Sequence, residues 1–419
     1  MNAQVQVHSE IDPLRRVIIH EPDSGISRVS PKRSNELLFD DIVYLPHMIQ
    51  EHRIFRRVLE QFLGEDQVYE TQQLLAESLG QDEETRETII KWVLDFEELP
   101  TSYLQQFNKY DDAKLAEVLI SGYDLEEDYI YFDPIPNFIF TRDIAAVIND
   151  HVLITKAAKS ARYRENFLTR SIFWSHPHFK GLKEEGKVIN LNHVDLFPPS
   201  RRGEPICLEG GDVMILNQDY LLIGSSERTN EHTIHALKSV LFERNIVRNV
   251  VQIVIPPDRS FMHIDTIFTQ IAAEHIVAYK PIVVDGLSSY VNVFRKGGAQ
   301  AFYPSIEAFF HAEINSQIAF IHAGQGISPY QEREQWTDGC NLVAIKPGVA
   351  LTYDRNPFTE KALIEHGYQI MHAQVFLKSC DTGQLNPETL ENTIITLPSN
   401  ELSRARGGSH CMTCPILRG

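Results

Sequence analysis

The sequence predicts an α/β protein built from repeats of one unit, in which two strands are followed by a helix and a returning strand. Apolar runs at 213–216 and 220–224 flank an Asn-Gln-Asp turn, which indicates a β-hairpin. Residues 229–243 then carry apolar side chains at helical spacing, and 250–255 is again a short apolar run. This order of elements is typical of a compact ββαβ module.

The same order of elements recurs along the chain. It starts again at Ala145 and at Leu342, and weaker copies begin near Asp265 and at the amino terminus, where 16–20 predicts a strand and 52–62 a helix. One module cannot bury both faces of its sheet alone, so about five of them most simply close into a ring with shared sheet surfaces. A length of 419 residues therefore fits one ring better than three domains in a row.

One segment interrupts the repeats. Between 72 and 121, leucine, isoleucine and tryptophan recur at helical spacing with acidic faces between them, which predicts a helical insert. We expect this insert to be a lid with no chemistry of its own. The predicted division is a catalytic α/β domain over 1–70 and 126–419, with a helical insert domain over 71–125.

Charge and composition argue against several classes of function. With 57 acidic and 39 basic residues the chain has a formal charge of -18, which disfavours binding to nucleic acid or to an anionic membrane surface. No apolar run approaches the roughly 18 residues that span a bilayer, and the start of the chain does not resemble a secretory signal. Five cysteines are too few and too unevenly spaced for a disulfide framework, so we expect free thiols and a cytoplasmic location.

Polar residues cluster just before or at the first strand of each repeat. Because these strand ends converge in a ring, clusters that keep register with the repeat predict one shared axial site. The clusters are 140–143, 209–212, 263–265, 338–341 and 407–415.

The last cluster contains a C-x-x-C pair, Cys411 and Cys414, which is compatible with several kinds of site. The pair could be a redox dithiol, half of a zinc site, or one structural and one catalytic thiol. No second C-x-x-C or C-x-x-H supplies further zinc ligands, so we predict no metal site. We prefer Cys411 as a nucleophile, since Gly407 and Gly408 shortly before it let a ligand approach the backbone closely. The role of Cys414 stays open, and Cys340 is expected to be a packing thiol.

His263 and Asp265 form an H-x-D pair on a predicted strand, which places both side chains on one face. A carboxylate orients a neighbouring histidine and makes it more basic, as a general acid or base requires, although such a pair can also be purely structural. Asp143 and Glu209 add further carboxylates. A thiolate with a histidine suits attack on an sp2 carbon, and carboxylates around it favour a planar cation, so we predict a guanidine or amidine carbon as the electrophile.

Motifs along nearly the whole chain match one known family. They are Phe140-Thr-Arg-Asp143, Glu209-Gly-Gly-Asp212, Met262-His-Ile-Asp-Thr266 and Arg406-Gly-Gly-Ser-His-Cys-Met-Thr-Cys-Pro415, together with His8-Ser-Glu-Ile11, Glu36-Leu-Leu-Phe-Asp-Asp41, Arg333-Glu-Gln-Trp336 and Tyr353-Asp-Arg-Asn356. These segments resemble the bacterial arginine deiminases of the guanidine-modifying superfamily. The resemblance implies a five-bladed, pseudo-fivefold ββαβ propeller, the pentein fold, with an α-helical insert. It also implies hydrolysis of L-arginine to L-citrulline and ammonia.

The resemblance gives each catalytic residue a role. Cys411 attacks the guanidinium carbon, while Asp143 and Asp265 hold the guanidinium nitrogens. Glu209 helps to hold and polarise the site. His263 protonates the departing ammonia and then activates the water that hydrolyses the S-alkylthiouronium adduct. This chemistry needs neither a metal nor an organic cofactor.

By the same resemblance, a further set of residues recognises the amino-acid end of the substrate. Asn137, Arg162, Arg228 and Arg406 contact the α-carboxylate and α-amino groups, and His410 lies on a mobile loop at the entrance. Alternatives stay open: a different guanidine or ureido compound such as agmatine, methylarginine or citrulline, or a non-catalytic relative that only binds arginine. The expected partner is L-arginine, and the oligomeric state is left open, a homo-oligomer included.

Overall fold

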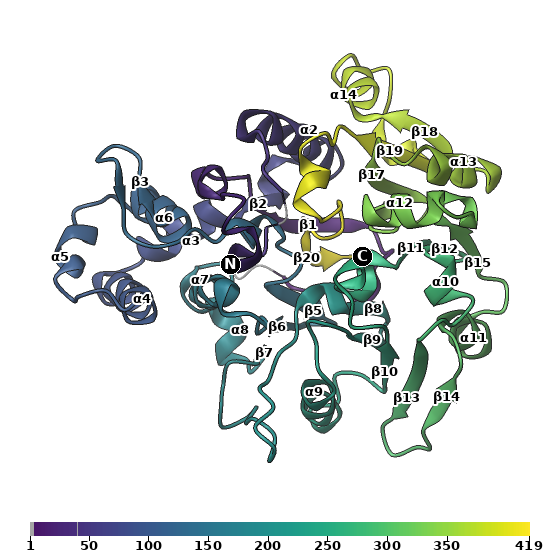
Figure 1. Ribbon diagram of the computed structural model, residues 1–419, viewed down its shortest axis with the longest axis horizontal. Coiled ribbons are helices and arrows are strands. Elements are labelled where there is room, and N and C mark those ends of the chain that lie inside the picture. The colour runs from purple at the N-terminus through teal and green to yellow at the C-terminus, as the bar shows by residue number, and fades with distance from the viewer. Residues whose placement is uncertain (1–3, 40) are drawn as a thin grey trace.

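The computed structural model describes residues 4–39 and 41–419, and within them five mixed sheets follow one strand pattern (Figure 1). In each of them a central strand pairs antiparallel with one neighbour and parallel with the other. The strand groups are β20 (Cys414–Arg418), β1 (Leu14–Ile19) and β2 (Val68–Glu70); β5 (Ala145–Ile148), β6 (His151–Ile154) and β7 (Val188–Asn190); β8 (Val213–Asn217), β9 (Tyr220–Ser225) and β10 (Asn249–Val254); β11 (Phe268–Ala272), β12 (His275–Ala278) and β15 (Ala319–His322); and β16 (Val343–Lys346), β17 (Val349–Tyr353) and β19 (Thr393–Leu397). Asp40, in the segment 36–41 noted above, lies outside the described residues.

Local sequence explains how the repeated unit turns and where its helix starts. β5 and β6 are joined through Asn149, which has a φ of 54° in the left-handed region that asparagine tolerates better than most residues. Helix α9 (Glu231–Glu243) starts two residues later than the spacing predicted, because the Asn230 side chain accepts the Thr233 N–H and caps the helix there.

Helices connect the strands of the repeats, and α9 lies outside β8, β9 and β10 in Figure 1. The longer ones are α2 (Leu45–Leu63), α7 (Tyr163–Ser175), α9 and α13 (Pro357–Glu365). Shorter helices are α1 (Ser34–Leu37), α8 (Lys180–Glu184), α10 (Lys280–Val283), α11 (Ile306–Phe309) and α12 (Tyr330–Trp336). Within the ranges that the structure describes, no helix is both long enough and apolar enough to cross a membrane.

The last repeat departs from the predicted strand order. A strand, β18 (Gln369–His372), does follow helix α13, where the ββαβ order predicts the returning strand. It pairs with the outer edge of β19, however, so that β19 and not β18 lies beside β17. The additional helix α14 (Ala373–Asp381) separates β18 from β19 in the chain. The sequence pattern indicates the first apolar run after the helix as the next strand. Which run pairs with the hairpin depends on strand pairing, which the pattern does not contain.

Another addition widens one sheet. The hairpin β13 (Tyr290–Arg295) and β14 (Ala301–Tyr303) lies between β12 and β15 in the chain. It nevertheless joins the neighbouring sheet, because β13 pairs antiparallel with β10. The hairpin therefore links two consecutive repeats.

The helical insert follows β2 and extends to one side of the sheets in Figure 1. It contains α3 (Thr71–Leu79), α4 (Glu83–Phe96), α5 (Tyr103–Phe107), α6 (Asp112–Ser121) and the short hairpin β3 (Tyr123–Asp124) and β4 (Tyr129–Ile130). Leu115 and Leu119 of α6 belong to the same buried apolar cluster as Leu168 and Ile172 of α7. The insert and the α/β part therefore share one core, whose burial stabilises both.

Candidate active site

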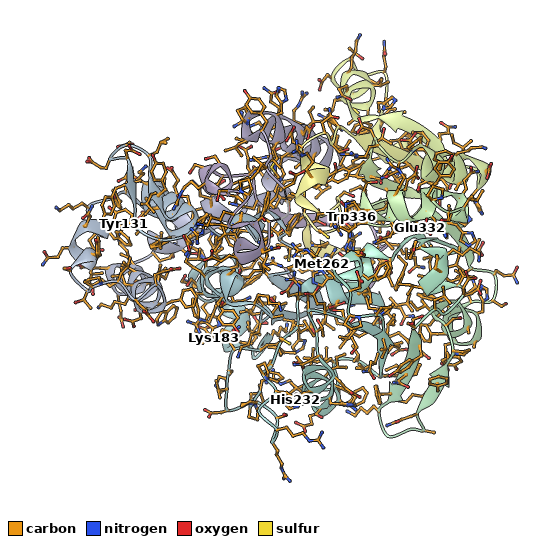
Figure 2. All side chains as sticks on the ribbon, viewed as in Figure 1. Tyr131, Lys183, His232, Met262, Glu332 and Trp336 are labelled. Carbon is orange, nitrogen blue, oxygen red and sulfur yellow. The ribbon has the colours of Figure 1, made fainter. Side chains whose placement is uncertain are left out.

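A cavity opens among the turns that precede the first strands of the repeats. Cys411, His263, Asp143 and Glu209 line it, around about 460 Å³ of empty space. In Figure 2, Met262, another lining residue, lies near the middle of the molecule. The remaining lining residues are Leu38, Asn137, Phe140, Arg162, Arg228, Thr266, Ala405 and Arg406.

The repeat explains why residues so far apart in the chain meet here. Asp143 precedes β5, Glu209 precedes β8, Asp265 precedes β11 and Cys411 precedes β20, in each case by two to four residues. Equivalent turns of successive repeats thus face the same centre. The structure brings these side chains together, as the register of the polar clusters predicted.

The two thiols of the C-x-x-C pair have different surroundings. Cys411 lines the cavity, and its Sγ lies 3.4 Å from Oδ2 of Asp265. Its backbone N–H donates to Oδ1 of Asn341 at 3.0 Å, which holds the residue in place. Cys414 begins β20, and its thiol donates to the carbonyl of Ala145 within the apolar core. Of the pair, Cys411 is the thiol that a ligand in the cavity can reach.

Negative charge surrounds the Cys411 thiol. Burial, and then the carboxylates of Asp265, Asp143 and Asp338, raise the pKa of this thiol well above its usual range. The thiol is therefore protonated at neutral pH until a cation offsets these charges.

His263 lies between two carboxylates of the cavity. Its Nε2 is 3.1 Å from Oε2 of Glu209, and its Nδ1 is 3.7 Å from Oδ1 of Asp143. Burial opposes a positive charge here, but the charges of Asp143, Glu209 and Asp212 outweigh it and raise the pKa of His263 to about 10. His263 is thus an imidazolium at neutral pH, the form that can donate a proton.

The predicted pairing of His263 with Asp265 on one face of a strand is wrong. Both residues precede β11, and 264–266 form a short 3₁₀ turn to which the alternation of a strand does not apply. Asp265 faces His410 and Cys411 instead. Glu209 takes the place at His263 that the spacing gave to Asp265.

Arg162 joins three carboxylates at the edge of the cavity. Its Nη1 donates to Oδ2 of Asp143 at 2.7 Å and to Oε2 of Glu209 at 3.0 Å. Its Nε donates to Oε2 of Glu165 at 3.0 Å, and the whole side chain is buried. A substrate carboxylate would therefore have to replace one of these partners in order to contact Arg162.

Arg228 and Arg406 are the other cations that line the cavity. Nη1 of Arg228 lies 3.6 Å from Glu209, and its Nε donates no hydrogen bond to any described residue. The Arg406 guanidinium lies 3.2 Å from the ring centroid of Trp336, a cation–π contact. Asn137 also lines the cavity, and its side-chain amide donates to the carbonyl of Leu37 at 2.8 Å. Arg228 is therefore the better placed cation for an anionic group of a ligand.

The expected position of His410 at the entrance is wrong. The residue is only 3% exposed, and it does not line the cavity that contains Cys411. Its Nδ1 lies 2.9 Å from Oδ2 of Asp265, and its Nε2 lies 3.5 Å from Oε2 of Glu10. Asp265 therefore lies between His410 and the Cys411 thiol.

Asp143, Glu209 and His263 are a set of described residues that could hold a metal ion, since their ligand atoms all lie within 4.8 Å of one another. They fit a metal poorly, however, because Nη1 of Arg162 already lies within hydrogen-bond distance of both carboxylates. A cationic imidazole next to them is also a poor ligand. Protein cations therefore already neutralise this group.

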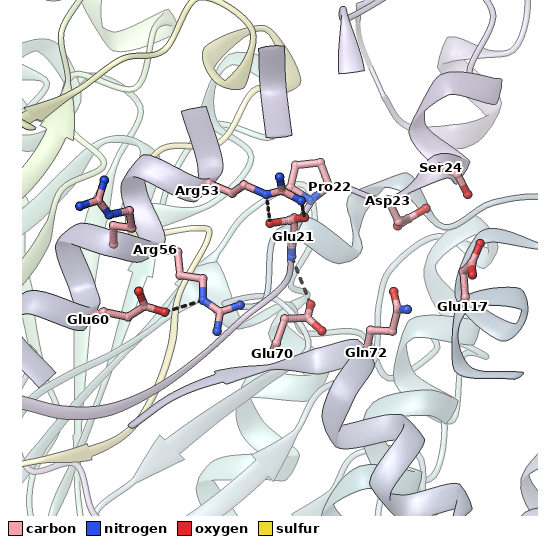
Figure 3. Close-up of a pocket in the computed structure, with 11 residues that line it drawn as sticks. Glu21, Pro22, Asp23, Ser24, Arg53, Arg56, Glu60, Glu70, Gln72 and Glu117 are labelled. Carbon is pink, nitrogen blue, oxygen red and sulfur yellow. Dashed lines mark hydrogen bonds and ion pairs between the residues drawn. The ribbon is translucent and has the colours of Figure 1, made fainter. Parts of the chain in front are cut away.

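A larger hollow, of about 1270 Å³, lies near α2 and the segment after β1 (Figure 3). Four of its charged groups pair with one another: Arg53 lies 2.8 Å from Glu21, and Arg56 lies 2.7 Å from Glu60. No cysteine or histidine is among its lining residues. Size alone thus does not identify the site, and the smaller cavity contains the reactive groups.

Two residues that organise the site were missed from the sequence. Asn341 accepts the N–H of Cys411 and donates through Nδ2 to the carbonyl of Asp265 at 3.0 Å. Its place in the polar cluster 338–341 was the signal that could have identified it. Glu165 binds Arg162 three residues earlier, a spacing at which oppositely charged helical residues meet.

Two solved structures share the fold over nearly the whole chain. One is SxtG, an amidinotransferase from Microseira wollei in the saxitoxin biosynthetic pathway, with a TM-score of 0.55 and 16% identity over 99% of this chain and 98% of that one. The other is the N-terminal domain of ArgZ, an arginine dihydrolase from the ornithine-ammonia cycle in cyanobacteria, bound to its product. It has a TM-score of 0.51 and 13% identity over 97% of this chain and 98% of that one.

Comparison of sequences identifies the family more specifically than the similarity of the folds does. The arginine deiminase family matches residues 35–123 and 98–418. The chain is 30% identical to the arginine deiminase of Listeria monocytogenes serovar 1/2a over 442 residues of alignment, which cover 100% of this chain and 98% of that protein. It is 31% identical to the arginine deiminase of Bacillus cereus strain ATCC 10987, with coverage of 100% and 99%. The chain therefore belongs to the arginine deiminase family.

Proposed function

We propose that this protein hydrolyses L-arginine to L-citrulline and ammonia through a covalent adduct on Cys411. Family membership makes it a hydrolase that acts on arginine. The observation that carries the mechanism is the buried thiol of Cys411, which lines one cavity with the protonated His263 and the carboxylates of Asp143 and Glu209. Such a cavity suits a planar cation with an electrophilic carbon.

Binding of the guanidinium is proposed to prepare both partners for reaction. Oδ1 of Asp265 is buried and has no hydrogen-bond partner among the described residues, so it is available to accept from a guanidinium N–H. Asp143 lines the cavity, and Asp265 lies next to it, 3.4 Å from the Cys411 thiol. A cation between these carboxylates offsets the charge that raises the pKa of Cys411, and the thiol then releases its proton to water and becomes a nucleophile.

The chemical steps then need one group that changes role. The Cys411 thiolate bonds to the guanidinium carbon, and the bond from that carbon to the leaving nitrogen breaks as His263 donates its proton, which releases ammonia. His263, now neutral, takes a proton from water, and the resulting hydroxide attacks the S-alkylthiouronium carbon. The C–S bond breaks as the hydroxyl proton of this adduct passes to the departing sulfur, which gives citrulline and restores the Cys411 thiol.

The direct test is incubation of the protein with L-arginine and measurement of citrulline and ammonia. We expect the two products in equal amounts. Agmatine, methylarginine and citrulline, offered as alternative substrates, should react more slowly, and no citrulline from L-arginine would overturn the proposal.

Close packing at Gly211 provides a test of the role of His263. A Cβ on Gly211 would lie 2.6 Å from Nδ1 of His263, so Gly211→Ala must displace the imidazole. We expect kcat to fall by about 100-fold or more, the usual loss when a general acid–base is misplaced. Gly298→Ala, where the added Cβ meets only the Arg295 side chain, is the control and should keep wild-type kcat. A Gly211→Ala enzyme with unchanged kcat would contradict the assigned role.

Arg228 is proposed to bind the substrate carboxylate, with Arg406 and Asn137 beside it. Its Nε lies 3.8 Å from Oε1 of Glu227 but donates no hydrogen bond to a described residue, which supports this role. A hydrogen bond between charged groups contributes about 1.5–3 kcal/mol. Arg228→Ala should therefore raise KM for L-arginine by about 10- to 100-fold and leave kcat within about threefold. For agmatine, which has no carboxylate, kcat/KM should barely change. Equal losses on both substrates would show that Arg228 does not read the carboxylate.

The proposal also covers the overall fold, the domain division, the partners and the cellular location of the protein. Five units of equal strand pattern support a closed, five-bladed, pseudo-fivefold propeller, with a catalytic domain over 1–70 and 126–419 and an insert domain over 71–125. The formal charge of -18 supports a protein that binds neither nucleic acid nor membrane. The proposed location is the cytoplasm.

A further inference from the structure

An exposed indole lies against one wall of the cavity. Trp336, the last residue of α12, is 46% exposed. The guanidinium carbon of Arg406 lies 3.2 Å from the centroid of its ring, and Arg406 lines the cavity that contains Cys411. Trp336 itself is not among the lining residues. The ring therefore contacts the site through Arg406.

Hydrogen bonds hold the end of α12 against the cavity wall. Nε2 of Gln335 donates to the carbonyl of Ser260 at 2.8 Å and to the carbonyl of Thr266 at 3.2 Å. These two carbonyls lie on either side of Met262 in the chain, and both Met262 and Thr266 line the cavity. Trp336 and Met262 also lie close together in Figure 2. Because Trp336 directly follows Gln335, its ring is held beside the site.

The backbone at Arg406 is fixed as well. Arg406 has a φ of 65°, in the left-handed region that a residue with a Cβ seldom adopts unless its surroundings hold it there. The hydroxyl of Tyr353 donates to the carbonyl of the next residue, Gly407, at 2.7 Å. A Cβ on Gly407 would lie 2.2 Å from the ring of Phe140, so the chain is closely packed here. The long Arg406 side chain therefore starts from a fixed point, and its far end needs a separate support.

Contacts with Arg259 and Trp336 support the guanidinium at that far end. Nη2 of Arg406 donates to the carbonyl of Arg259 at 3.4 Å, and the guanidinium carbon lies over the Trp336 ring. An indole is the side chain that attracts a cation most strongly through its ring face. Stacking uses the face of the guanidinium and not its N–H groups, which lie in its plane. Trp336 can therefore hold Arg406 in place without competing with a carboxylate for the same donors.

We propose that Trp336 is a positioning residue, whose ring holds Arg406 at the cavity in the place where it can bind the α-carboxylate of the substrate. This inference rests on the proposed function, in which Arg406 lies beside Arg228 at the carboxylate end of L-arginine. It gives an exposed residue outside the cavity a part in selecting amino acids over amines. A guanidine compound that has no carboxylate gains nothing from the contact between Trp336 and Arg406.

The first test compares Trp336→Leu with the wild type on two substrates. Leucine keeps apolar bulk but has no aromatic face, so Arg406 loses its support. We expect KM for L-arginine to rise by about 3- to 30-fold, the range that a cation–π contact supplies, with kcat within about threefold of the wild type. For agmatine, which has no carboxylate, kcat/KM should stay within about twofold. Trp336→Phe keeps a ring and should recover part of the loss.

A double-variant cycle separates this role from a structural one. In an Arg406→Met background, Trp336→Leu should raise KM no further, because the side chain that the ring supports is gone. Tyr330→Leu is the matched control. Tyr330 begins the same helix, is 40% exposed and stacks on Phe358 with 3.9 Å between ring centroids, and neither of these rings lines the cavity. This control should keep wild-type KM for L-arginine.

The possible results are distinct. An unchanged or lower KM in Trp336→Leu, equal losses on L-arginine and agmatine, or a loss that persists in the Arg406→Met background overturns the positioning role, while the wild type still makes citrulline. A wild type that makes no citrulline overturns the proposed function itself.

Discussion

Replacing Cys411 by serine is expected to lower kcat for citrulline formation by at least about 1,000-fold. A cation in the cavity can bring the Cys411 thiol to its thiolate, since the raised pKa comes partly from carboxylates that the cation offsets. A serine hydroxyl is far less acidic, so the same cation leaves it protonated and poorly nucleophilic. The substitution is nearly isosteric, and the hydrogen bond from the residue 411 N–H to Asn341 remains available.

Cys414→Ser is the matched control for this experiment. Cys414 lies in the core and donates to the carbonyl of Ala145, a bond that a hydroxyl can also make. We expect kcat within about threefold of the wild type, and at most a modest loss of thermal stability. Mass spectrometry of the acid-quenched wild-type enzyme with L-arginine should detect a covalent adduct on the peptide that contains residue 411. Activity that survives in the Cys411 variant and disappears in the Cys414 variant would reverse the assignment.

Sequence alone could predict much of this fold because the strands are consecutive apolar runs bounded by turn residues. β8 and β9 lie within one residue of the predicted runs 213–216 and 220–224, and β5 and β16 start within one residue of the predicted repeat starts at Ala145 and Leu342. The distinction between β18 and β19 could not be predicted, since both are short apolar runs after a helix, and their order depends on pairing between distant segments.

The cavity was predictable for a related reason. Asp143, Glu209, His263 and Cys411 all lie shortly before the first strand of a repeat. Equivalent segments of the repeats come together in the structure, so the four side chains line one cavity. The direction of a side chain within a turn has no such periodicity. His410 illustrates this limit: its neighbour Cys411 faces the cavity, whereas His410 faces Glu10, which lies 400 residues earlier in the chain.

Arg162→Met is expected to destabilise the fold as well as reduce activity, because it leaves Asp143, Glu165 and Glu209 without their shared cation. Breaking one partner from a buried ion cluster typically costs about 3–5 kcal/mol. Methionine keeps the length of the stem, so the loss reports on charge rather than on packing. We expect a lower free energy of unfolding in urea, and a fall in kcat, since His263 depends on the same two carboxylates.

The pH dependence of the stability of Arg162→Met shows whether unpaired carboxylates cause the loss of stability. Arg162 lowers the pKa values of Glu165 and Glu209, so its loss raises both in the folded state, and the folded protein then binds more protons than the unfolded chain as pH falls. Stability of the variant should therefore recover toward that of the wild type between pH 7 and pH 5.

Arg228→Met is the control for the stability measurement, because Arg228 is as deeply buried as Arg162 but its closest carboxylate oxygen is 3.6 Å away. It should lose less stability than Arg162→Met and show little recovery at pH 5. An Arg162→Met variant with wild-type stability and only a raised KM for L-arginine would mean that Arg162 is free to bind the substrate carboxylate, as the family resemblance implies. The geometry instead favours Arg162 as the internal counterion of three buried carboxyl groups, two of which line the cavity.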